Sequence, residues 1–403
     1  MRNTSSKTLP LFLARCCLAI YMVYNVYLVP IEFFIPRLSI MMLFLSTLLT
    51  VISVKPLKVK KEIQILFGFL IYAITTGVIV AIDTGILFGQ ALFLFESIWA
   101  GAVFFNLVKD VQSFRLFTLA FALGSFMLGA YCVLNPNLLL TVNGRVTLGE
   151  DFNANTLGVI LMFGSWFVIF TMNGDKTGIV RISITFALLL LLLYVIILSA
   201  SRKAVFGYAF FVLAWFVQMF IGGSAKTKKI IRIVGMPLLV VLGIYIYQRF
   251  SDSFIDASEI LFKRMDTVEE GMSDRESIIK ESWSVFLDNP IIGVGLDNNR
   301  FHTAMKLYAH NSYFELLACT GIIGAFIFFS LYYKMLAYLF RHLKRINQFI
   351  QQPLVYYTST LIVVYLFIGY GQIHMYNQNL MFILYFIFAL ISFDQQAQDN
   401  ISR

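Results

Sequence analysis

The chain has 403 residues, of which 59% are hydrophobic and 13% are charged, and its formal net charge is +9. A soluble domain is about a quarter charged and about half apolar, so a soluble fold of this length could not cover so much apolar surface. The basic residues stand in short clusters between apolar runs. That pattern indicates membrane topology and anionic headgroups, and it excludes nucleic acid as the reason for the charge.

Apolar stretches long enough to cross a bilayer recur along the whole chain. We therefore predict an all-α polytopic membrane protein of about twelve transmembrane helices, forming a single membrane domain over residues 1–403. The first stretch is expected to be a retained span and not a signal peptide. The predicted spans are 11–29, 38–54, 63–82, 86–108, 114–134, 153–172, 180–199, 203–222, 230–248, 312–340, 354–371 and 376–393.

Lysine and arginine residues fix the expected orientation, because short cytoplasmic loops are enriched in them. Alternate short loops hold about four times as many basic residues as the loops between them. The rich loops include Lys55, Lys58, Lys60, Lys61, Lys109, Arg115, Lys176, Arg181, Lys226, Lys228, Lys229, Arg232, Arg341, Lys344 and Arg345. Both termini are therefore predicted to be cytoplasmic, in a bacterial inner (plasma) membrane.

The long loop between the ninth and tenth spans, residues 249–311, is then extracytoplasmic, and we expect amphipathic helices in it. Ser273 to Glu276 has the S-x-x-E form that predicts a helix start, and Asn289-Pro290 predicts its end. The residues between them form an apolar stripe at helical spacing: Ile278, Ile279, Trp283, Phe286 and Leu287. The segment "IIGVGLDNNRF" then predicts a tight turn, followed by a second short amphipathic stretch.

The predicted outer face also collects unusual polar residues, namely Arg145, Arg202, Arg275, His310 and Asn311. Each has an ordinary explanation: an arginine at a span boundary snorkels to headgroups, and a histidine at a helix start caps it. Positive charge outside is nevertheless disfavoured by topology. Guanidinium forks bind phosphate oxygens bidentately, and an imidazole nearby can act as a general base. Together these residues predict a site for a lipid-linked phosphate or diphosphate.

The sequence lacks the motifs of nucleotide-binding, zinc-protease and metal-dependent sugar-nucleotide sites. The sequence has no G-x-x-x-x-G-K-[ST], no H-E-x-x-H and no outward D-x-D pair, and its four cysteines have no metal-ligand spacing. We expect no metal and no cofactor. A transporter for a lipid-linked or anionic solute remains an alternative, although it should carry polar residues at mid-membrane. The charges within spans are few: Arg15, Glu96, Glu315 and Lys334.

Three blocks resemble the O-antigen ligase and O-antigen, capsule or exopolysaccharide polymerase superfamily of bacterial membrane glycosyltransferases. "LSASRKAVFGY" is similar to its Ser-Arg block at a span start. "MSDRESIIKESWSVFLDNPIIGVGLDNNRF" resembles its Arg-helix and Pro-x-x-Gly-x-Gly block in the large outer loop. "AHNSYFELLACTGIIG" resembles its His-Asn and Gly-x-x-Gly block. The resemblance covers roughly residues 145–330.

The resemblance implies metal-independent transfer of a glycan from an undecaprenyl-diphosphate-linked oligosaccharide donor to an acceptor hydroxyl. Arg202 and Arg275 match the family's essential arginines, and His310 matches its essential histidine, thought to activate the acceptor. Arg145, Lys203 and Asn311 are expected to contact substrate. Arg300, His302 and Lys306 lie in the same loop without an assigned role.

The resemblance leaves the exact reaction open. We favour a polysaccharide polymerase, with a ligase that moves finished glycan onto lipid A-core as the alternative. The expected partners are the lipid-linked donor, a glycan or lipid A-core acceptor and membrane lipids, with no nucleic acid. Contacts with other polysaccharide-assembly proteins are an open expectation. The active site is expected to face the periplasm or the exterior.

Overall fold

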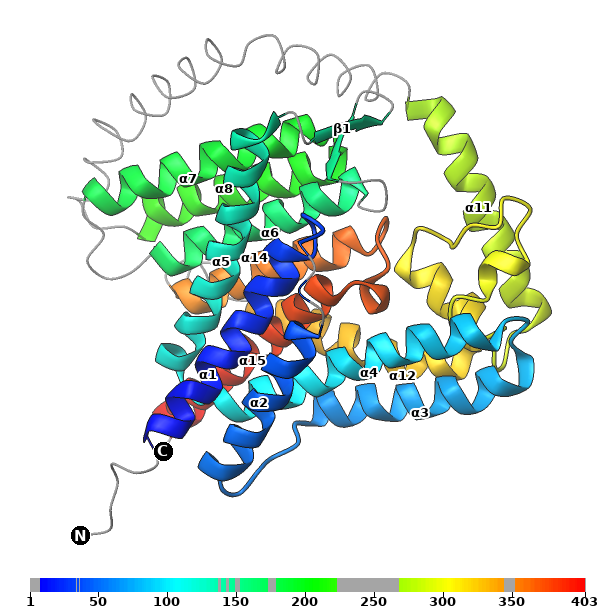
Figure 1. The fold of residues 1–403 in the computed structure, drawn as a ribbon, viewed down its shortest axis with the longest axis horizontal. Coiled ribbons are helices and arrows are strands. Elements are labelled where there is room, and N and C mark those ends of the chain that lie inside the picture. Colours follow the sequence, from blue (N-terminus) through cyan, green and yellow to red (C-terminus); the bar gives the residue numbers. More distant parts are fainter. Residues whose placement is uncertain are drawn as a thin grey trace. The chain divides into compact units, whose positions relative to one another are not determined.

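The computed structural model describes residues 8–33, 35, 37–136, 139–142, 145–148, 153–172, 179–222, 268–343 and 352–402 (Figure 1). Within these residues, nine helices are long and apolar enough to cross a membrane, and two more apolar helices are shorter. The helices are α1 (Thr8–Val23), α2 (Leu38–Ser53), α3 (Lys61–Val80), α4 (Thr84–Leu107), α5 (Val111–Leu134), α6 (Ala154–Met172), α7 (Ile179–Leu198), α8 (Arg202–Gly222), α11 (Val268–Asp288), α12 (Ser312–Leu343), α14 (Pro353–Ile368) and α15 (Gln378–Ser402).

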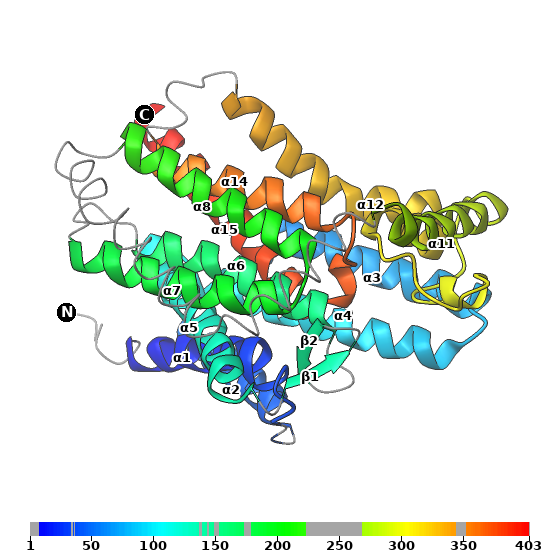
Figure 2. The same ribbon diagram turned by 90° about the horizontal axis from the view of Figure 1, so that it is seen from above.

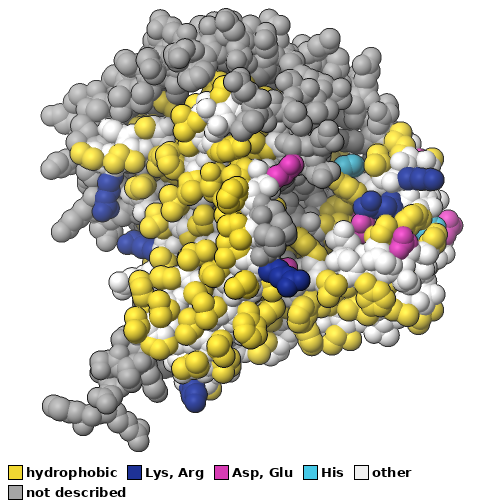
Figure 3. All heavy atoms as spheres, viewed as in Figure 1, with side chains coloured by type: hydrophobic (Ala, Val, Ile, Leu, Met, Phe, Trp, Pro, Cys, Tyr) yellow, Lys and Arg dark blue, Asp and Glu magenta, His cyan; other side chains and the backbone are white. Residues whose placement is uncertain are grey.

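These helices confirm the predicted all-α, multi-pass architecture. For each predicted span that the structure describes, the predicted first residue lies within three residues of the first residue of an observed helix. The predicted span 230–248 lies outside the described residues. Large apolar side chains such as Ile79 and Phe326 are 76% and 77% exposed, as expected for surfaces that lipid covers. Figure 3 shows hydrophobic side chains across much of the visible face of the described helices.

One small element was not expected from the sequence. β1 (Leu139–Val142) and β2 (Arg145–Leu148) form a two-stranded antiparallel sheet, in which Val142 pairs with Arg145. β2 contacts α6, which follows it. The short pattern of these strands is weak beside the long apolar runs on either side of it, and that is why it was missed.

The prediction for the long loop was partly wrong. α11 begins at Val268, so Ser273 and Glu276 lie inside the helix and do not form a capping box at its start. The helix ends at Asp288, as Asn289-Pro290 predicted. Between 289 and 311, all of which the structure describes, the only regular element is a 3-10 turn, η5 (Asn299–Phe301), in place of a second amphipathic helix.

The helices fall into two compact units. Unit 1 comprises Met1–Leu49, Asp110–Asp266 and Asn347–Thr360, and in it α6 packs against α5, α7 and α8. Trp166 of α6 stacks on Phe170, and its indole N–H donates to the Tyr357 carbonyl at 3.2 Å. Unit 2 comprises Thr50–Lys109, Thr267–Ile346 and Leu361–Arg403. In it α3 packs on α4 and α12, α4 packs on α15, and α11 packs on α12 (Figures 1 and 2).

The most unusual feature of unit 2 is a break in α12 at Gly321, where φ is 60° and ψ is −171°. The break frees backbone groups that an intact helix would pair. The segment after α11 pairs them instead: Val294 N–H donates to the Ala318 carbonyl at 3.0 Å, and Gly295 N–H donates to the Cys319 carbonyl at 2.8 Å. In return, Ile322 N–H donates to the Pro290 carbonyl at 2.8 Å. Residues 290–295 are thus inserted into the break.

Glycines make this insertion possible. A Cβ on Gly321 would overlap the Ile291 backbone, and a Cβ on Gly293 would overlap the Cys319 backbone. Gly293, Gly295 and Gly321 all have positive φ, a region that glycine enters without steric cost. The Tyr72 hydroxyl of α3 donates to the Thr320 carbonyl at 3.1 Å, which fixes the break from a second side. The two motif blocks of the sequence, Pro-x-x-Gly-x-Gly and Gly-x-x-Gly, therefore meet at one backbone junction.

We predict that Gly321→Ala destabilises the protein by about 3 kcal/mol, because the new Cβ is strained at positive φ and overlaps the inserted segment. The measurement is thermal unfolding of the purified protein in detergent. Gly68→Ala is the matched control, since a Cβ at that position in α3 meets nothing within 4 Å and alanine favours a helix. An unfolding temperature unchanged by Gly321→Ala would show that the junction does not depend on this glycine.

Candidate functional site

His310 and Asn311 stand at the start of α12, where the loop meets the helix. Asn311 is fully buried, and its Oδ1 accepts hydrogen bonds from Tyr313 N–H at 2.9 Å and Phe314 N–H at 3.4 Å. It therefore caps the helix, while its Nδ2 has no hydrogen-bond partner among the described residues. The His310 ring is partly exposed and lies 4.2 Å, centroid to centroid, from the ring of Tyr308.

The backbone of His310 is itself unusual. Its φ is +49°, and Asp297 and Lys306 in the same loop also have positive φ. Such conformations cost about 1–3 kcal/mol each for residues other than glycine, and they persist only where the surroundings impose them. Residues held in this way cluster at functional sites. The loop therefore places His310 in a conformation that its own sequence does not favour.

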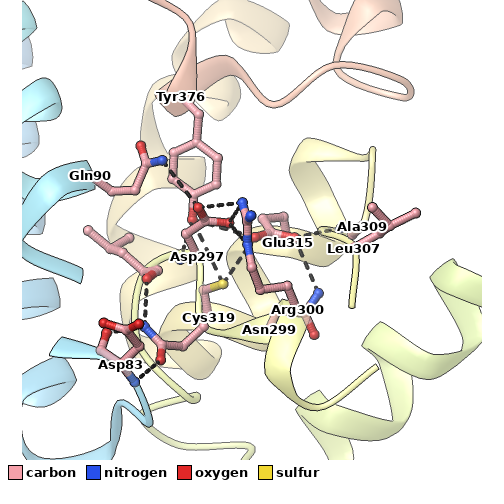
Figure 4. Close-up of polar contacts among 12 residues, drawn as sticks. Asp83, Gln90, Asp297, Asn299, Arg300, Leu307, Ala309, Glu315, Cys319 and Tyr376 are labelled. Atoms are coloured by element: carbon pink, nitrogen blue, oxygen red, sulfur yellow. Dashed lines mark hydrogen bonds and ion pairs between the residues drawn. The ribbon is translucent and has the colours of Figure 1, made fainter. Parts of the chain in front are cut away.

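A buried carboxylate holds the residue before His310 (Figure 4). Glu315 is fully buried, one turn into α12, and its Oε2 accepts from Ala309 N–H at 2.8 Å and from Asn299 Nδ2 at 3.2 Å. The same Asn299 amide donates to Ser282 of α11 at 2.9 Å. Glu315 thus connects α12, the residue before His310 and, through Asn299, the long loop helix.

A second charged pair lies beside this carboxylate. Arg300 Nε donates to Asp297 Oδ1 at 2.9 Å, and its Nη2 contacts both carboxylate oxygens. Gln90 of α4 donates to Asp297 Oδ2 at 3.2 Å, and Asp297 N–H donates to the Tyr376 hydroxyl at 2.7 Å (Figure 4). Burial raises the pKa of Asp297, and the adjacent Arg300 partly offsets that rise. The pair therefore joins the loop to α4 and to the segment before α15.

Charged side chains gather at the loop end of unit 2. In Figure 3 acidic, basic and histidine side chains gather over the region where α11 and the following loop lie in Figure 1. Burial and the nearby Glu315 raise the pKa of Tyr308, despite the opposing charge of Arg300. The Arg300 guanidinium also lies 5.7 Å from the centre of the Tyr308 ring. His310 therefore has a neighbour whose phenol stays neutral and can donate a hydrogen bond.

Arg202 and Lys203 begin α8 in unit 1, after a sharp turn. Ala200 in that turn has φ +46°, and Ser199 and Ser201 are fully buried. The turn packs closely on α6, because a Cβ on Gly158 would lie 2.7 Å from Ser199 Oγ. Arg202 and Lys203 remain partly exposed. The Ser-Arg block is thus a tight, strained turn that presents its basic residues at a helix start.

Arg145 and Arg275 are described only through their backbones. Arg145 is the first residue of β2, in unit 1. Arg275 lies inside α11, three residues before Ile278 and seven before Ser282, both buried. That spacing places position 275 on the face of α11 that packs toward the loop. The structure therefore groups position 275 with His310 and Asn311 in unit 2, and places Arg145, Arg202 and Lys203 in unit 1.

Several residues of this site were not singled out from the sequence. Glu315 was noticed only as a charge within a span, and Asp297, Asn299 and Tyr376 were not considered. A carboxylate inside an apolar span is a functional candidate by default, and that signal could have found Glu315. Among the described residues, no group of three or more His, Cys, Asp or Glu side chains could hold a metal ion.

Part of the chain is similar in sequence to known proteins. A family model described as O-antigen ligase matches residues 187–329. The chain is also 27% identical over 206 residues to the teichuronic acid biosynthesis protein TuaE of Bacillus subtilis (strain 168). That alignment covers 48% of this chain and 41% of the relative, so the chain matches about two fifths of the relative's length. Residues 187–329 are therefore similar to the O-antigen ligase family, and part of the chain is similar to a protein named for teichuronic acid biosynthesis.

These similarities support the superfamily predicted from the three sequence blocks. The apolar helices indicate a multi-pass membrane protein, and its similarities are to an O-antigen ligase family and to a protein of teichuronic acid biosynthesis. The O-antigen ligase match includes Arg202, Lys203, Arg275, His310 and Asn311, whereas Arg145 precedes it. The individual roles of these residues remain predictions.

We predict that Glu315→Leu increases hydrogen exchange at the Ala309 amide by tenfold or more, because a hydrogen bond to a charged acceptor is worth about 1.5–3 kcal/mol. Exchange followed by mass spectrometry on the purified protein measures this change. Glu62→Leu serves as the control, since Glu62 lies in α3 and pairs with Lys334 of α12 at 2.9 Å. Unchanged Ala309 exchange in Glu315→Leu would contradict the role of Glu315 in fixing the residue before His310.

Proposed function

We propose that this protein transfers a glycan from an undecaprenyl-diphosphate carrier to an acceptor hydroxyl at the extracytoplasmic face of the membrane. The observation that carries the proposal is the position of His310. It is partly exposed, it is held at positive φ beside the buried Glu315, and it opens a membrane span within the O-antigen ligase match. The basic loops support an orientation with both termini in the cytoplasm.

In this proposal the arginines stabilise the leaving group. A diphosphate that departs from a sugar carries charge that needs fixed cationic donors more than a proton. Arg202 and Arg275 bind its oxygens, because the guanidinium fork matches phosphate geometry. Lys203 and Arg145 add positive charge, while Asn311, also predicted to contact substrate, is fully buried where it caps α12. No metal is needed for this chemistry.

His310 acts as the general base. The acceptor oxygen forms a bond to the anomeric carbon while the bond from that carbon to the diphosphate oxygen breaks. The acceptor proton moves to the imidazole of His310, and the lipid diphosphate leaves with the bonding electrons. Attack opposite the leaving group inverts the anomeric centre, and product linkage analysis that found retention would exclude this geometry.

We favour a polymerase that joins lipid-linked repeat units. The relative is named for teichuronic acid biosynthesis, which supports a biosynthetic role, and the family description, O-antigen ligase, favours the alternative of transfer to lipid A-core. A glycan gel of a deletion strain separates the two. Single-repeat products support the polymerase, whereas polymer left on the carrier with bare core supports the ligase.

A transporter for a lipid-linked or anionic solute is less well supported. Its coupling charges would lie within the spans, but two of the candidates have structural partners. Glu96 accepts from Gln378 at 3.4 Å, and Lys334 pairs with Glu62 at 2.9 Å. These contacts favour roles for both residues in helix packing.

We predict that His310→Ala lowers glycan transfer by about 10²–10⁴-fold, the usual contribution of a general base, and leaves donor binding intact. The assay uses purified protein with a defined lipid-linked glycan and candidate acceptors. His302→Ala, an exposed histidine of the same loop, should transfer at nearly the normal rate. Unimpaired transfer by His310→Ala would refute the assignment.

We also predict that Arg202→Gln and Arg275→Gln each lower transfer by about 10²–10³-fold, because each removes a fixed cation from the developing diphosphate. Lysine at either position should restore only part of the rate, since it keeps the charge but loses the bidentate fork. The control is Arg341→Gln, an exposed arginine in the last turn of α12. Full activity with lysine at both positions would show that charge alone suffices.

A further inference from the structure

A second site candidate lies at the other end of unit 2. The loop contacts the start of α4, where Asn298 Oδ1 accepts from Asp83 N–H at 2.8 Å. α4 has 24 residues and therefore runs about 36 Å, slightly more than the apolar thickness of a bilayer. Its far end borders a cavity of about 190 Å³. The cavity is thus separated from the loop by the whole membrane.

The cavity combines cations with apolar walls. Its lining contains Lys58, Lys60, Lys109, Ser392 and Gln396, together with Phe105, Val108, Ala389 and Phe393. None of these nine described residues is acidic. Two carboxylates directly follow lining residues along the chain: Asp110 accepts from Ser113 N–H at 2.6 Å, and Asp394 pairs with His342 at 3.1 Å. The cavity therefore has a net positive lining beside aromatic surface, a composition that suits an anion attached to an apolar group.

The position of the lysines is built into the fold. The Asn106 side chain of α4 accepts from Lys58 N–H at 3.0 Å and donates to the Lys58 carbonyl at 2.9 Å. Asn106 is buried, so this pairing fixes the backbone of the lysine segment. Lys60 Nζ donates to Ser392 Oγ of α15 at 3.2 Å. Membrane orientation requires only that lysines be present in this loop. Here the fold also holds Lys58 and Lys60 at a single cavity.

An apolar groove adjoins the same segment. Its volume is about 580 Å³, and it runs between α3 and α4, lined by Val59, Ile63, Gln64, Phe67, Gly68, Phe95, Ile98, Trp99 and Ala102. Side chains alternate along an extended segment, so Val59 faces the groove while Lys58 and Lys60 face the cavity. Cavity and groove therefore share a wall.

We propose that the lysine cavity binds the phosphate headgroup of an anionic phospholipid whose acyl chain lies in the α3–α4 groove. The cavity has room for roughly six waters at about 30 Å³ each, enough for a phosphate group with its substituents. By the orientation proposed above, the lipid belongs to the cytoplasmic leaflet. This site is independent of the glycan-transfer chemistry, which lies at the opposite end of α4.

The test is lipid binding to the delipidated full-length protein, measured by native mass spectrometry with phosphatidylglycerol, phosphatidylcholine and soluble glycerol phosphate. We expect phosphatidylglycerol to bind in preference to phosphatidylcholine. Lys58→Gln with Lys60→Gln should weaken phosphatidylglycerol binding by roughly tenfold or more. The matched control is Lys55→Gln with Lys61→Gln, which removes the same charge from the same loop outside the cavity, and it should change binding less than about twofold.

A groove variant separates a lipid from a free phosphate. Gly68 lines the groove and a Cβ there meets nothing within 4 Å, so Gly68→Phe is designed to project a ring into the groove. It should weaken phosphatidylglycerol binding while binding of glycerol phosphate stays unchanged. If both double lysine variants lost phosphatidylglycerol binding equally, the lipid would be attracted by the charge of the whole loop and the proposal would be overturned. Full phosphatidylglycerol binding in Gly68→Phe, with displacement by glycerol phosphate, would also overturn it and identify a free phosphate as the ligand.

Discussion

A membrane protein must pair every backbone group that it places away from water. In unit 2 this requirement determines how the long loop is attached to the helices. The break in α12 at Gly321 leaves the carbonyls of Ala318 and Cys319 without helical partners. The segment after α11 pairs these carbonyls by entering the break. Its own Pro290 and Ile291 carbonyls then accept from the N–H groups of Ile322 and Ile323, which follow the break. Val285, Val294 and Ala318 pack together around this junction. The long loop is therefore attached to the membrane helices through its backbone. This attachment fixes the start of the segment that leads to His310.

The site residues lie downstream of that junction and depend on buried charge. Glu315 would be costly in an apolar span if it stood alone, but it accepts hydrogen bonds from Asn299, at the start of the η5 turn, and from Ala309, which follows that turn. In doing so it draws Ala309 against α12 and leaves His310 at positive φ beside the helix start. Asp297 and Arg300 pair a few residues earlier and extend the connection to α4 and Tyr376. The histidine is thus positioned by contacts to its neighbours' backbone, while its ring stays partly exposed for chemistry.

The sequence predicted the helices well because span length and hydrophobicity are local properties, and every described span lies where its apolar run does. It also pointed to His310, Asn311 and Arg202 through their motifs. It did not predict that the two glycine motifs meet, because residues 290–295 and 318–323 are separated along the chain and the contact uses backbone atoms that carry no residue signature. The capping box at Ser273 was wrong because a local pattern was read without the preceding turns of α11. Glu315 and Asp297 were underrated because their partners, Asn299 and Gln90, become neighbours only in the fold.

The same junction has a consequence for how such chains diverge. Its hydrogen bonds join main-chain atoms, and its steric demands fall on the few positions where a Cβ would collide. Substitutions at the other positions alter what the loop displays without altering where it is held. A chain can therefore change most of its surface chemistry, and with it the molecules it accepts, while the frame that carries the histidine stays in register.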